Sequence, residues 1–314
     1  MQYRALGSSG LTVSAVGLGT WAMGGGTDWG PVDDAQSLNV ISAALDAGIN
    51  FIDTAPVYGF GHAEEIVGQA LKGRRSQVLL ATKCGLVRFE KGVNHWLKPD
   101  SVARELEASL NRLQTDYIDL YQIHWPDPQT PLEDTLSMLV KLQQQGKIRC
   151  IGVSNFDAAL LNRAAELCSV ASVQNEYSFL DKQRAEAVFP MCREKQIGFI
   201  GYGSLAGGIL SGKYKKEANI RRCDARSYFY RFYKGSNFEQ VRKITDRFAK
   251  VAEAWNKPVS AVALNWALLR AEVSAALCGA RTPQQLLQNV QADGWKLSPE
   301  DAAYLEGSAF SCVK

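Results

Sequence analysis

Short apolar runs alternate with helix-like segments along almost the whole 314-residue chain. The apolar runs have the length and the Val, Ile and Leu content of buried parallel strands. The segments between them carry apolar residues at every third or fourth position, as amphipathic helices do. Because parallel neighbours need a crossover connection, usually a helix, this alternation predicts a parallel sheet with helices between its strands.

Eight strand-and-helix units can be distinguished, which is the number that closes a (β/α)8 TIM barrel. The expected strands span residues 15–21, 50–55, 77–83, 117–124, 148–155, 171–178, 197–204 and 274–280. The expected helices span 33–48, 62–73, 99–114, 131–147, 156–168, 183–196, a stretch near 238–255, and 282–291. We therefore expect an α/β chain that folds as one barrel domain over residues 1–314, with an N-terminal β-hairpin.

Residues at the segment ends support these boundaries. Two of the expected helices end at Gly48 and Gly146, the position where a left-handed residue is common. Asp100 and Thr282 lie beside prolines, and we expect them to be N-caps. Long loops at 84–97 and 205–236 follow expected strands, and loops of this kind on a barrel's catalytic face shape substrate access.

Composition excludes several classes of function. The chain has 35 basic and 32 acidic residues, no basic run and no apolar stretch near the ~20 residues that span a bilayer. Its seven cysteines include no CxxC pair, its three histidines show no metal-ligand spacing, and its first residues lack a signal peptide's apolar centre. We expect a cytoplasmic protein that binds neither nucleic acid, nor membrane, nor metal.

Four polar residues follow or end three neighbouring strands: Asp53, Tyr58, Lys83 and His124. Catalytic residues of TIM barrels come from this end of the strands. A tyrosine is a poor proton donor at neutral pH because its ordinary pKa is about 10. A nearby ammonium stabilises its phenolate, a carboxylate can hold that ammonium, and a histidine can orient a substrate. Each residue also has an ordinary structural alternative, as a helix cap, an ion pair, a core histidine or loop packing. Together they suggest protonation of a carbonyl group during its reduction.

Two glycine-rich turns follow the last two strands, at residues 201–208 and 279–282. Barrels commonly bind phosphate there through backbone amides, although both could be ordinary tight turns. Asn155 and Gln174 end strands 5 and 6 and could bind a carboxamide, or Asn155 could cap a turn. Trp21, Trp29, Trp96 and Trp125 could line an apolar pocket or pack the loops.

A Rossmann dinucleotide site is an alternative, because residues 17–22 match the loose pattern GxGxxA. That motif must lead directly into a helix. Here it is followed by a glycine-rich segment, residues 23–31, which we expect to be non-helical. The barrel interpretation is therefore favoured.

Taken together, these motifs resemble those of the aldo-keto reductases. The resemblance rests on GLGTW, FIDTAPVYGFGHAEEIVG, LLATK, LQTDYIDLYQIHWPDP, GKIRCIGVSNF, SVQNEYS, YGSLAGGILSGKY and GARTPQQLLQN, and it covers residues 3 to about 291. The chain is most similar to the bacterial branch near the general-stress aldo-keto reductases, and more distantly to the potassium-channel β-subunits.

The resemblance implies a role for each matching residue. Tyr58 would be the general acid, Lys83 and Asp53 would lower its pKa, and His124 would orient the carbonyl. Trp21 and Trp125 would border the substrate. The residues implied to hold the cofactor are Thr20, Trp21, Asp53, Ser154, Asn155, Gln174, Tyr202, Gly203, Ser204, Leu205, Ala206, Gly207, Lys213, Gly279, Arg281, Gln285, Gln288 and Asn289.

Arg281 bears on which cofactor is used. A cation after the eighth strand is where this family binds the 2′-phosphate of NADP, and arginine suits a phosphate dianion. Many relatives have a second arginine at the position of Gln285 and an acidic residue at that of Gln288. The resemblance thus implies NADPH, with NAD as a second option. Longer relatives extend a C-terminal tail over the pocket, so a more open site is expected here.

The resulting expectation is an NAD(P)H-dependent reductase of small aldehydes and ketones. Two alternatives remain: a sugar or alcohol dehydrogenase, and a cofactor-binding sensor or regulatory subunit. A phosphate-binding isomerase on the same fold would need neither the amide pair nor Tyr202. The natural substrate, the direction of the reaction and the oligomeric state stay open.

Overall fold

Eight parallel strands close into a barrel in the computed structural model, which describes residues 1–90, 92–217, 220 and 224–307. Around the barrel they follow chain order, and the last pairs with the first. They are β3 (Val16–Gly19), β4 (Phe51–Asp53), β5 (Leu79–Cys84), β8 (Ile118–Ile123), β9 (Ile148–Ser154), β10 (Val170–Glu176), β11 (Gly198–Tyr202) and β12 (Val273–Cys278). The predicted (β/α)8 fold is confirmed.

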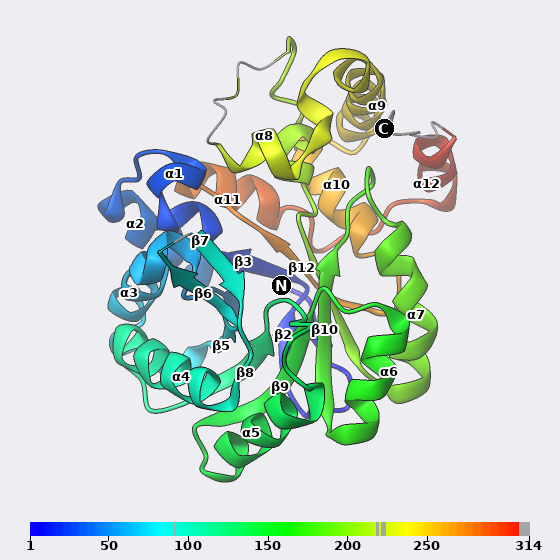
Figure 1. Ribbon diagram of the computed structural model, residues 1–314. Coiled ribbons are helices and arrows are strands. Elements are labelled where there is room, and N and C mark those ends of the chain that lie inside the picture. The colour runs from blue at the N-terminus through cyan, green and yellow to red at the C-terminus, as the bar shows by residue number, and fades with distance from the viewer. Residues whose placement is uncertain (91, 218–219, 221–223, 308–314) are drawn as a thin grey trace.

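Helices surround the barrel, and Figure 1 shows them as an outer ring. Between the strands lie α2 (Asp34–Asp46), α3 (His62–Ala70), α4 (Pro99–Leu113), α5 (Leu132–Gln144), α6 (Ala158–Leu167), α7 (Gln183–Lys195), α9 (Gly235–Ala254) and α10 (Val259–Ala267). After the last strand come α11 (Pro283–Val290) and α12 (Pro299–Glu306). In α4, Val102, Leu106, Leu110 and Leu113 are buried on one face. Apolar residues at this spacing hold the helix against the sheet.

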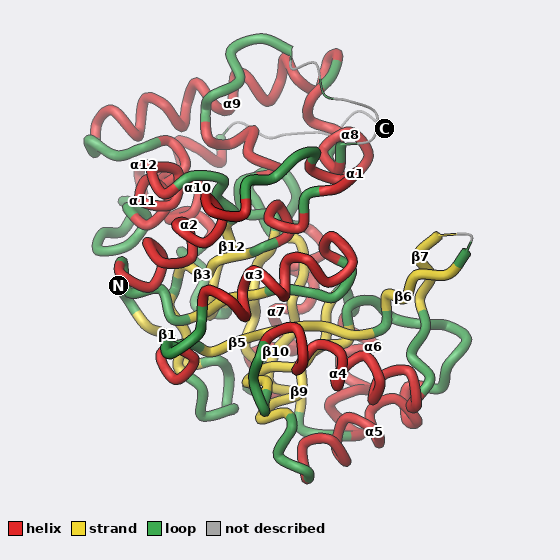
Figure 2. The backbone as a smooth tube through the Cα atoms, turned by 90° about the vertical axis from the view of Figure 1, so that its left-hand side faces the viewer, coloured by secondary structure: helices red, strands yellow, loops and turns green. Residues whose placement is uncertain are grey.

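Several local expectations need correction. Residues 84–97 contain a hairpin, β6 (Leu86–Phe89) with β7 (Gly92–His95), which projects from the barrel in Figure 2. The glycine-rich segment contains a one-turn helix, α1 (Gly26–Trp29). Asp100 is no N-cap, because Pro99 is already the first helical residue and Lys98 precedes it. Helix α10 was missed because nearly all its residues are buried and no polar face marks its period.

Other cap assignments are confirmed. The Thr282 side chain accepts a hydrogen bond from the backbone N–H of Gln285 at the start of α11. Gly48 and Gly146 adopt positive φ angles of 85° and 73° after α2 and α5. These residues set where the helices end and where the chain turns back into the sheet.

The N-terminal hairpin, β1 (Tyr3–Ala5) with β2 (Thr12–Ser14), closes one end of the barrel. Its Leu6 and Val13 are fully buried among Phe51 and other inward-facing strand residues. Gly7 makes this approach possible, since a Cβ there would lie 2.3 Å from the carbonyl oxygen of Gln196. The barrel interior is therefore filled from this end, and a site must lie at the other.

Side chains facing the barrel interior change character along each strand. Phe51, Ala81 and Leu120 form part of the inner apolar cluster. Two residues further on, Asp53, Lys83 and Gln122 are buried polar groups. Since alternate residues of a strand share a face, these polar groups lie directly above the apolar ones. The carboxyl end of the barrel thus holds a buried polar layer.

Some expectations concern absences. Within the described ranges, no helix is long and apolar enough to cross a membrane. Among the same residues, no group of three or more His, Cys, Asp or Glu is placed to hold a metal ion. Five cysteines are free thiols. Cys223, Cys312 and the C-terminal residues 308–314, where a tail over the pocket was considered, lie outside the described residues.

Candidate active site

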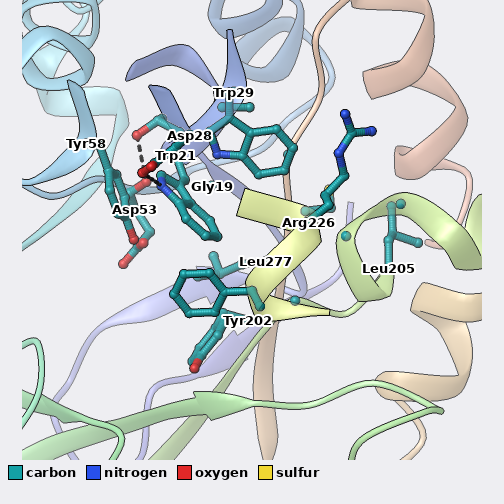
Figure 3. Close-up of a pocket in the computed structure, with 18 of the residues that line it drawn as sticks. Gly19, Trp21, Asp28, Trp29, Asp53, Tyr58, Tyr202, Leu205, Arg226 and Leu277 are labelled. Carbon is teal, nitrogen blue, oxygen red and sulfur yellow. Dashed lines mark hydrogen bonds between the residues drawn. The ribbon is translucent and has the colours of Figure 1, made fainter. Parts of the chain in front are cut away.

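A cavity of about 510 Å³ opens at the carboxyl ends of the strands. It extends from Tyr58 and His124, over the barrel mouth, to Arg281 and Gln285 at the start of α11. Figure 3 shows part of its lining, including Tyr58, Trp21, Trp29 and Tyr202. The predicted site residues that line it are Thr20, Trp21, Asp53, Tyr58, His124, Trp125, Ser154, Asn155, Gln174, Tyr202, Gly203, Ser204, Leu205, Gly207, Lys213, Gly279, Arg281 and Gln285.

Lys83 lies beneath the cavity and joins Asp53 to Tyr58. Its ammonium donates to Asp53 Oδ2 at 2.5 Å, to the carbonyl oxygen of Thr54 at 3.0 Å and to Tyr58 Oη at 3.3 Å. Lys83 is fully buried and Asp53 is 3% exposed. Burial lowers the pKa of Lys83, while Asp53 opposes that change. An ion pair with further hydrogen bonds is the form in which buried charges are tolerated.

The second carboxylate oxygen of Asp53 is also occupied. Its Oδ1 accepts from the amides of Gln174 at 2.8 Å and Gln122 at 3.1 Å. Gln174 was expected to face a carboxamide, yet its amide nitrogen is used here to hold Asp53. Gln122 was not predicted, although it occupies the inward-facing position of β8 two residues before His124. The alternation of inward-facing and outward-facing residues along β8 could have identified Gln122 from the sequence.

Burial and the Asp53 carboxylate raise the pKa of Tyr58 well above its usual value. This direction is opposite to the lowering that the resemblance implied. The reason is that a phenolate in the buried site would lose its hydration and face the Asp53 carboxylate. The Tyr58 side chain is therefore held as a protonated phenol, the form that a proton donor needs.

His124 stands at right angles to Tyr58, with 5.9 Å between the ring centroids. Burial, Lys83 and His95 lower the pKa of His124 well below its ordinary value. Its imidazole is therefore neutral at physiological pH and has one N–H to donate. The backbone around it is held by Asn155, whose amide donates to the carbonyl oxygen of His124 at 2.9 Å.

These pKa directions predict a flat pH profile for any reaction that needs protonated Tyr58. The acid form of a group with a raised pKa persists below that pKa, so Tyr58 should stay protonated past about pH 10. We expect kcat for carbonyl reduction to stay level from about pH 7 to about pH 9.5, and the reverse rate to rise with pH. Steady-state rates in both directions test this. A reductive rate that falls tenfold per unit above about pH 8 would contradict it.

Tyr202 forms one wall of the cavity. Its hydroxyl donates to Asn155 Oδ1 at 2.8 Å, and the Asn155 amide donates to Ser154 Oγ at 3.1 Å. This chain ties the ends of β9 and β11 together and fixes the plane of the Tyr202 ring. A fixed aromatic face with polar groups beside it suits a flat heterocycle that carries an amide.

The far end of the cavity offers backbone groups and cations. Gly203, Gly207 and Gly208 line it with positive φ angles of 66°, 66° and 94°. A Cβ built on Gly208 would lie 3.7 Å from Lys213 Nζ, which places an ammonium beside this turn. Such turns with an adjacent cation suit phosphate groups. Together with the Tyr202 wall, this donor set fits a nicotinamide dinucleotide.

Some residues expected at the cofactor do not line the cavity: Ala206, Gln288 and Asn289. Gln288 is exposed on α11, and the Asn289 amide contacts the carbonyl oxygen of Gly279 at 3.4 Å. Trp29 and Gly208 line the cavity, as the pocket and the glycine-rich turn predicted from the sequence allowed. Several lining residues were not predicted: Asp28, Val57, Leu86, Val93, Arg226, Tyr228, Phe229 and Tyr230. Most of these come from the long connections, where hydrophobic periodicity gives no signal.

Comparison with known proteins agrees with this geometry. A family model described as "Aldo/keto reductase family" matches residues 15–309. The aldo-keto reductase YhdN of Bacillus subtilis is 40% identical over 304 residues, covering 96% of this chain and 91% of YhdN. The NADH-specific methylglyoxal reductase of Escherichia coli is 35% identical and covers 97% of each chain.

A solved structure gives the same result. The glycerol dehydrogenase AKR11B4 from Gluconobacter oxydans superposes with a TM-score of 0.88 at 37% identity, covering 98% of this chain and 94% of that one. Fold, cavity and sequence therefore agree, and this chain is an oxidoreductase that belongs to the aldo/keto reductase family.

Proposed function

We propose that this protein reduces aldehydes and ketones to alcohols with NADPH, with NADH as a second cofactor. The observation that carries the proposal is the convergence of Tyr58 and His124 at one end of the cavity, with Lys83 and Asp53 directly behind Tyr58. The phenol is a proton donor for a carbonyl oxygen, and neutral His124 can hold that oxygen by a hydrogen bond. The substrate is a small molecule, and no metal takes part in the proposal.

The bound nicotinamide would supply a hydride to the carbonyl carbon. Tyr202 would hold its ring, Ser154 and Asn155 its carboxamide, and the turn of Gly203, Gly207 and Gly208 with Lys213 its diphosphate. Arg281 and Gln285 would hold the adenosine end. These assignments rest on where the side chains line the cavity.

Proton delivery follows from the buried hydrogen bonds. When Tyr58 gives its proton to the developing alkoxide, the phenolate that remains faces the Lys83 ammonium at 3.3 Å. Asp53 keeps that ammonium in position through its 2.5 Å contact, and Gln122 and Gln174 keep Asp53 in position. A preorganised cation next to the departing proton lowers the cost of charge development.

The proposal is tested by titrating the purified protein with NADPH and NADH through tryptophan fluorescence, and by assaying each cofactor with a panel of aldehydes. We expect binding of NADPH and aldehyde-dependent oxidation of it. Binding without turnover of any carbonyl would favour the sensor alternative, and absence of binding would refute the assigned cofactor site.

Cofactor preference should depend on Arg281. Its guanidinium lines the cavity and contacts the carbonyl oxygen of Trp29. A charged hydrogen bond to a phosphate is worth about 1.5–3 kcal/mol, so Arg281→Ala should weaken NADPH binding about ten- to a hundredfold and leave NADH binding within about threefold. Fluorescence titration measures both dissociation constants.

Arg242→Ala is the matched control, because it removes an arginine from the exposed face of α9, where Arg242 pairs with Asp246. Equal losses of NADPH and NADH affinity in Arg281→Ala would show that the side chain does not read the 2′-phosphate.

Alcohol oxidation is a second candidate function, and the likeness to a glycerol dehydrogenase favours it. The same residues would act in reverse, with the Tyr58 phenolate accepting the proton. Because the pKa of Tyr58 is raised, that phenolate is scarce at neutral pH. We therefore propose reduction as the working direction. We further propose that residues 1–314 act as one domain in the cytoplasm, which the family match and the unpaired cysteines support.

A further inference from the structure

The unpredicted carboxylate in the cavity wall, Asp28, lies on the one-turn helix α1 (Gly26–Trp29). Asp28 takes no part in the hydrogen bonds that join Tyr58, Lys83 and Asp53. Its two oxygens each accept one hydrogen bond from a different part of the fold. Trp21 Nε1 donates to Asp28 Oδ2 at 3.3 Å, drawn in Figure 3, and Tyr228 Oη donates to Asp28 Oδ1 at 2.8 Å.

The first of these bonds fixes an indole next to the proton donor. Trp21 stacks against Tyr58 with 6.0 Å between ring centroids and 29° between planes. Trp29 contacts Trp21 edge to face at 5.3 Å. The indole N–H has one direction in its plane, so its bond to Asp28 sets the rotation of the Trp21 ring over the cavity.

The second bond connects the distant helix α8 (Ala225–Phe229) to this wall, across 200 positions of sequence. Phe229, the last residue of α8, meets Trp21 edge to face at 5.0 Å. Tyr228 and Phe229 are 55% and 45% exposed, so burial alone holds them weakly. The Asp28 contact therefore locates α8 against the cavity.

We propose that Asp28 is a positioning residue that determines specificity: it holds Trp21 and α8 as an aromatic wall for carbonyl compounds with a flat, apolar substituent. This inference rests on the proposed carbonyl reduction at Tyr58. Trp21, Trp29 and Phe229 form the wall, and Val57, Leu86, Val93 and Trp125 also line the cavity. Apolar and aromatic surface of this kind stabilises an aryl group by burial and ring contacts.

The test compares kinetics for benzaldehyde and glyceraldehyde in the full-length enzyme. Asp28→Ala removes both hydrogen bonds and leaves the wall without its fixed geometry. Since ordering a free side chain on binding reduces affinity, KM for benzaldehyde should rise about five- to tenfold. KM for glyceraldehyde, which has little apolar surface to bury, should change less than about twofold, and kcat for both less than about threefold.

Two conservative variants separate positioning from a general structural role. Asp28→Asn keeps an oxygen for the Trp21 N–H and an amide that can donate to the Tyr228 oxygen, so it should restore wild-type KM. Tyr228→Phe removes the hydroxyl that joins α8 to Asp28 and should give a smaller rise in KM for benzaldehyde. Glu90→Ala removes an exposed carboxylate at the tip of the β6–β7 hairpin and is the control. It should leave KM and kcat for both aldehydes unchanged.

Several results would overturn the inference. One is an equal change of KM for both aldehydes in Asp28→Ala, another is no change, and a third is Asp28→Asn behaving like Asp28→Ala. If Asp28→Ala does not fold, the same comparison of KM for the two aldehydes is made with Tyr228→Phe, and an equal change or no change overturns the inference. A wild-type enzyme that reduces neither aldehyde would refute the proposed function itself, whereas turnover of both with unaffected variants would refute only the role of Asp28.

Discussion

Replacing Tyr58 with phenylalanine should reduce kcat for carbonyl reduction by about 10²–10⁴-fold, the usual contribution of a positioned general acid. The variant lacks the hydroxyl that receives the Lys83 contact at 3.3 Å, and the cavity then has no phenol at the reacting end. The ring remains to stack against Trp21. Steady-state rates with a saturating aldehyde measure the loss.

Cofactor binding provides the internal control for this variant. The residues proposed to hold the cofactor, from Tyr202 to Arg281, line the cavity and are unchanged in this variant. Dissociation constants for NADPH should therefore stay within about threefold of the wild type. Full turnover in Tyr58→Phe would show that another group protonates the carbonyl, and the mechanism would be wrong.

Lys83→Met should lower both stability and turnover. The methionine fills a similar volume but leaves the Asp53 carboxylate buried, with the amides of Gln122 and Gln174 as its remaining side-chain donors. Removing one partner of a buried ion pair costs about 3–5 kcal/mol in unfolding free energy. The midpoint of urea unfolding at neutral pH measures this loss. Turnover should fall because no ammonium then faces the tyrosine phenolate.

The double variant Asp53→Asn with Lys83→Met separates the two effects. It leaves no buried charge at this position, so much of the lost stability should return while turnover stays low. Unchanged urea unfolding in Lys83→Met would mean that the carboxylate is not left uncompensated. A double variant with wild-type turnover would remove Lys83 from the mechanism.

Much of the fold and the reacting end of the cavity could be predicted because both depend on local patterns. Strand periodicity identified the eight strands, and a polar residue at the carboxyl end of a barrel strand lies at the mouth of the barrel. Asp53, Lys83 and His124 follow from that rule. Gln122 obeys the same alternation, yet a glutamine in a strand has no chemical signature until Asp53 is seen to accept from it.

The remaining part of the cavity depends on how long connections fold over the barrel. Asp28, Trp29 and Phe229 come from segments whose paths are set by contacts between distant residues, such as the Tyr228 bond to Asp28. No periodic pattern encodes such contacts. The pKa direction of Tyr58 was mispredicted for a related reason, because the sequence shows which charges are near but not how deeply the phenol is buried. The individual roles of the cofactor residues stay predictions.

The central claim is that Tyr58 protonates a carbonyl while a nicotinamide cofactor reduces it. The most direct test is aldehyde-dependent loss of NADPH absorbance, measured side by side for the wild-type enzyme and Tyr58→Phe, each shown to bind NADPH. We predict turnover by the wild type and a loss of about a hundredfold or more in the variant. Equal rates in the two proteins, or NADPH binding by the wild type without oxidation by any aldehyde, would contradict the claim.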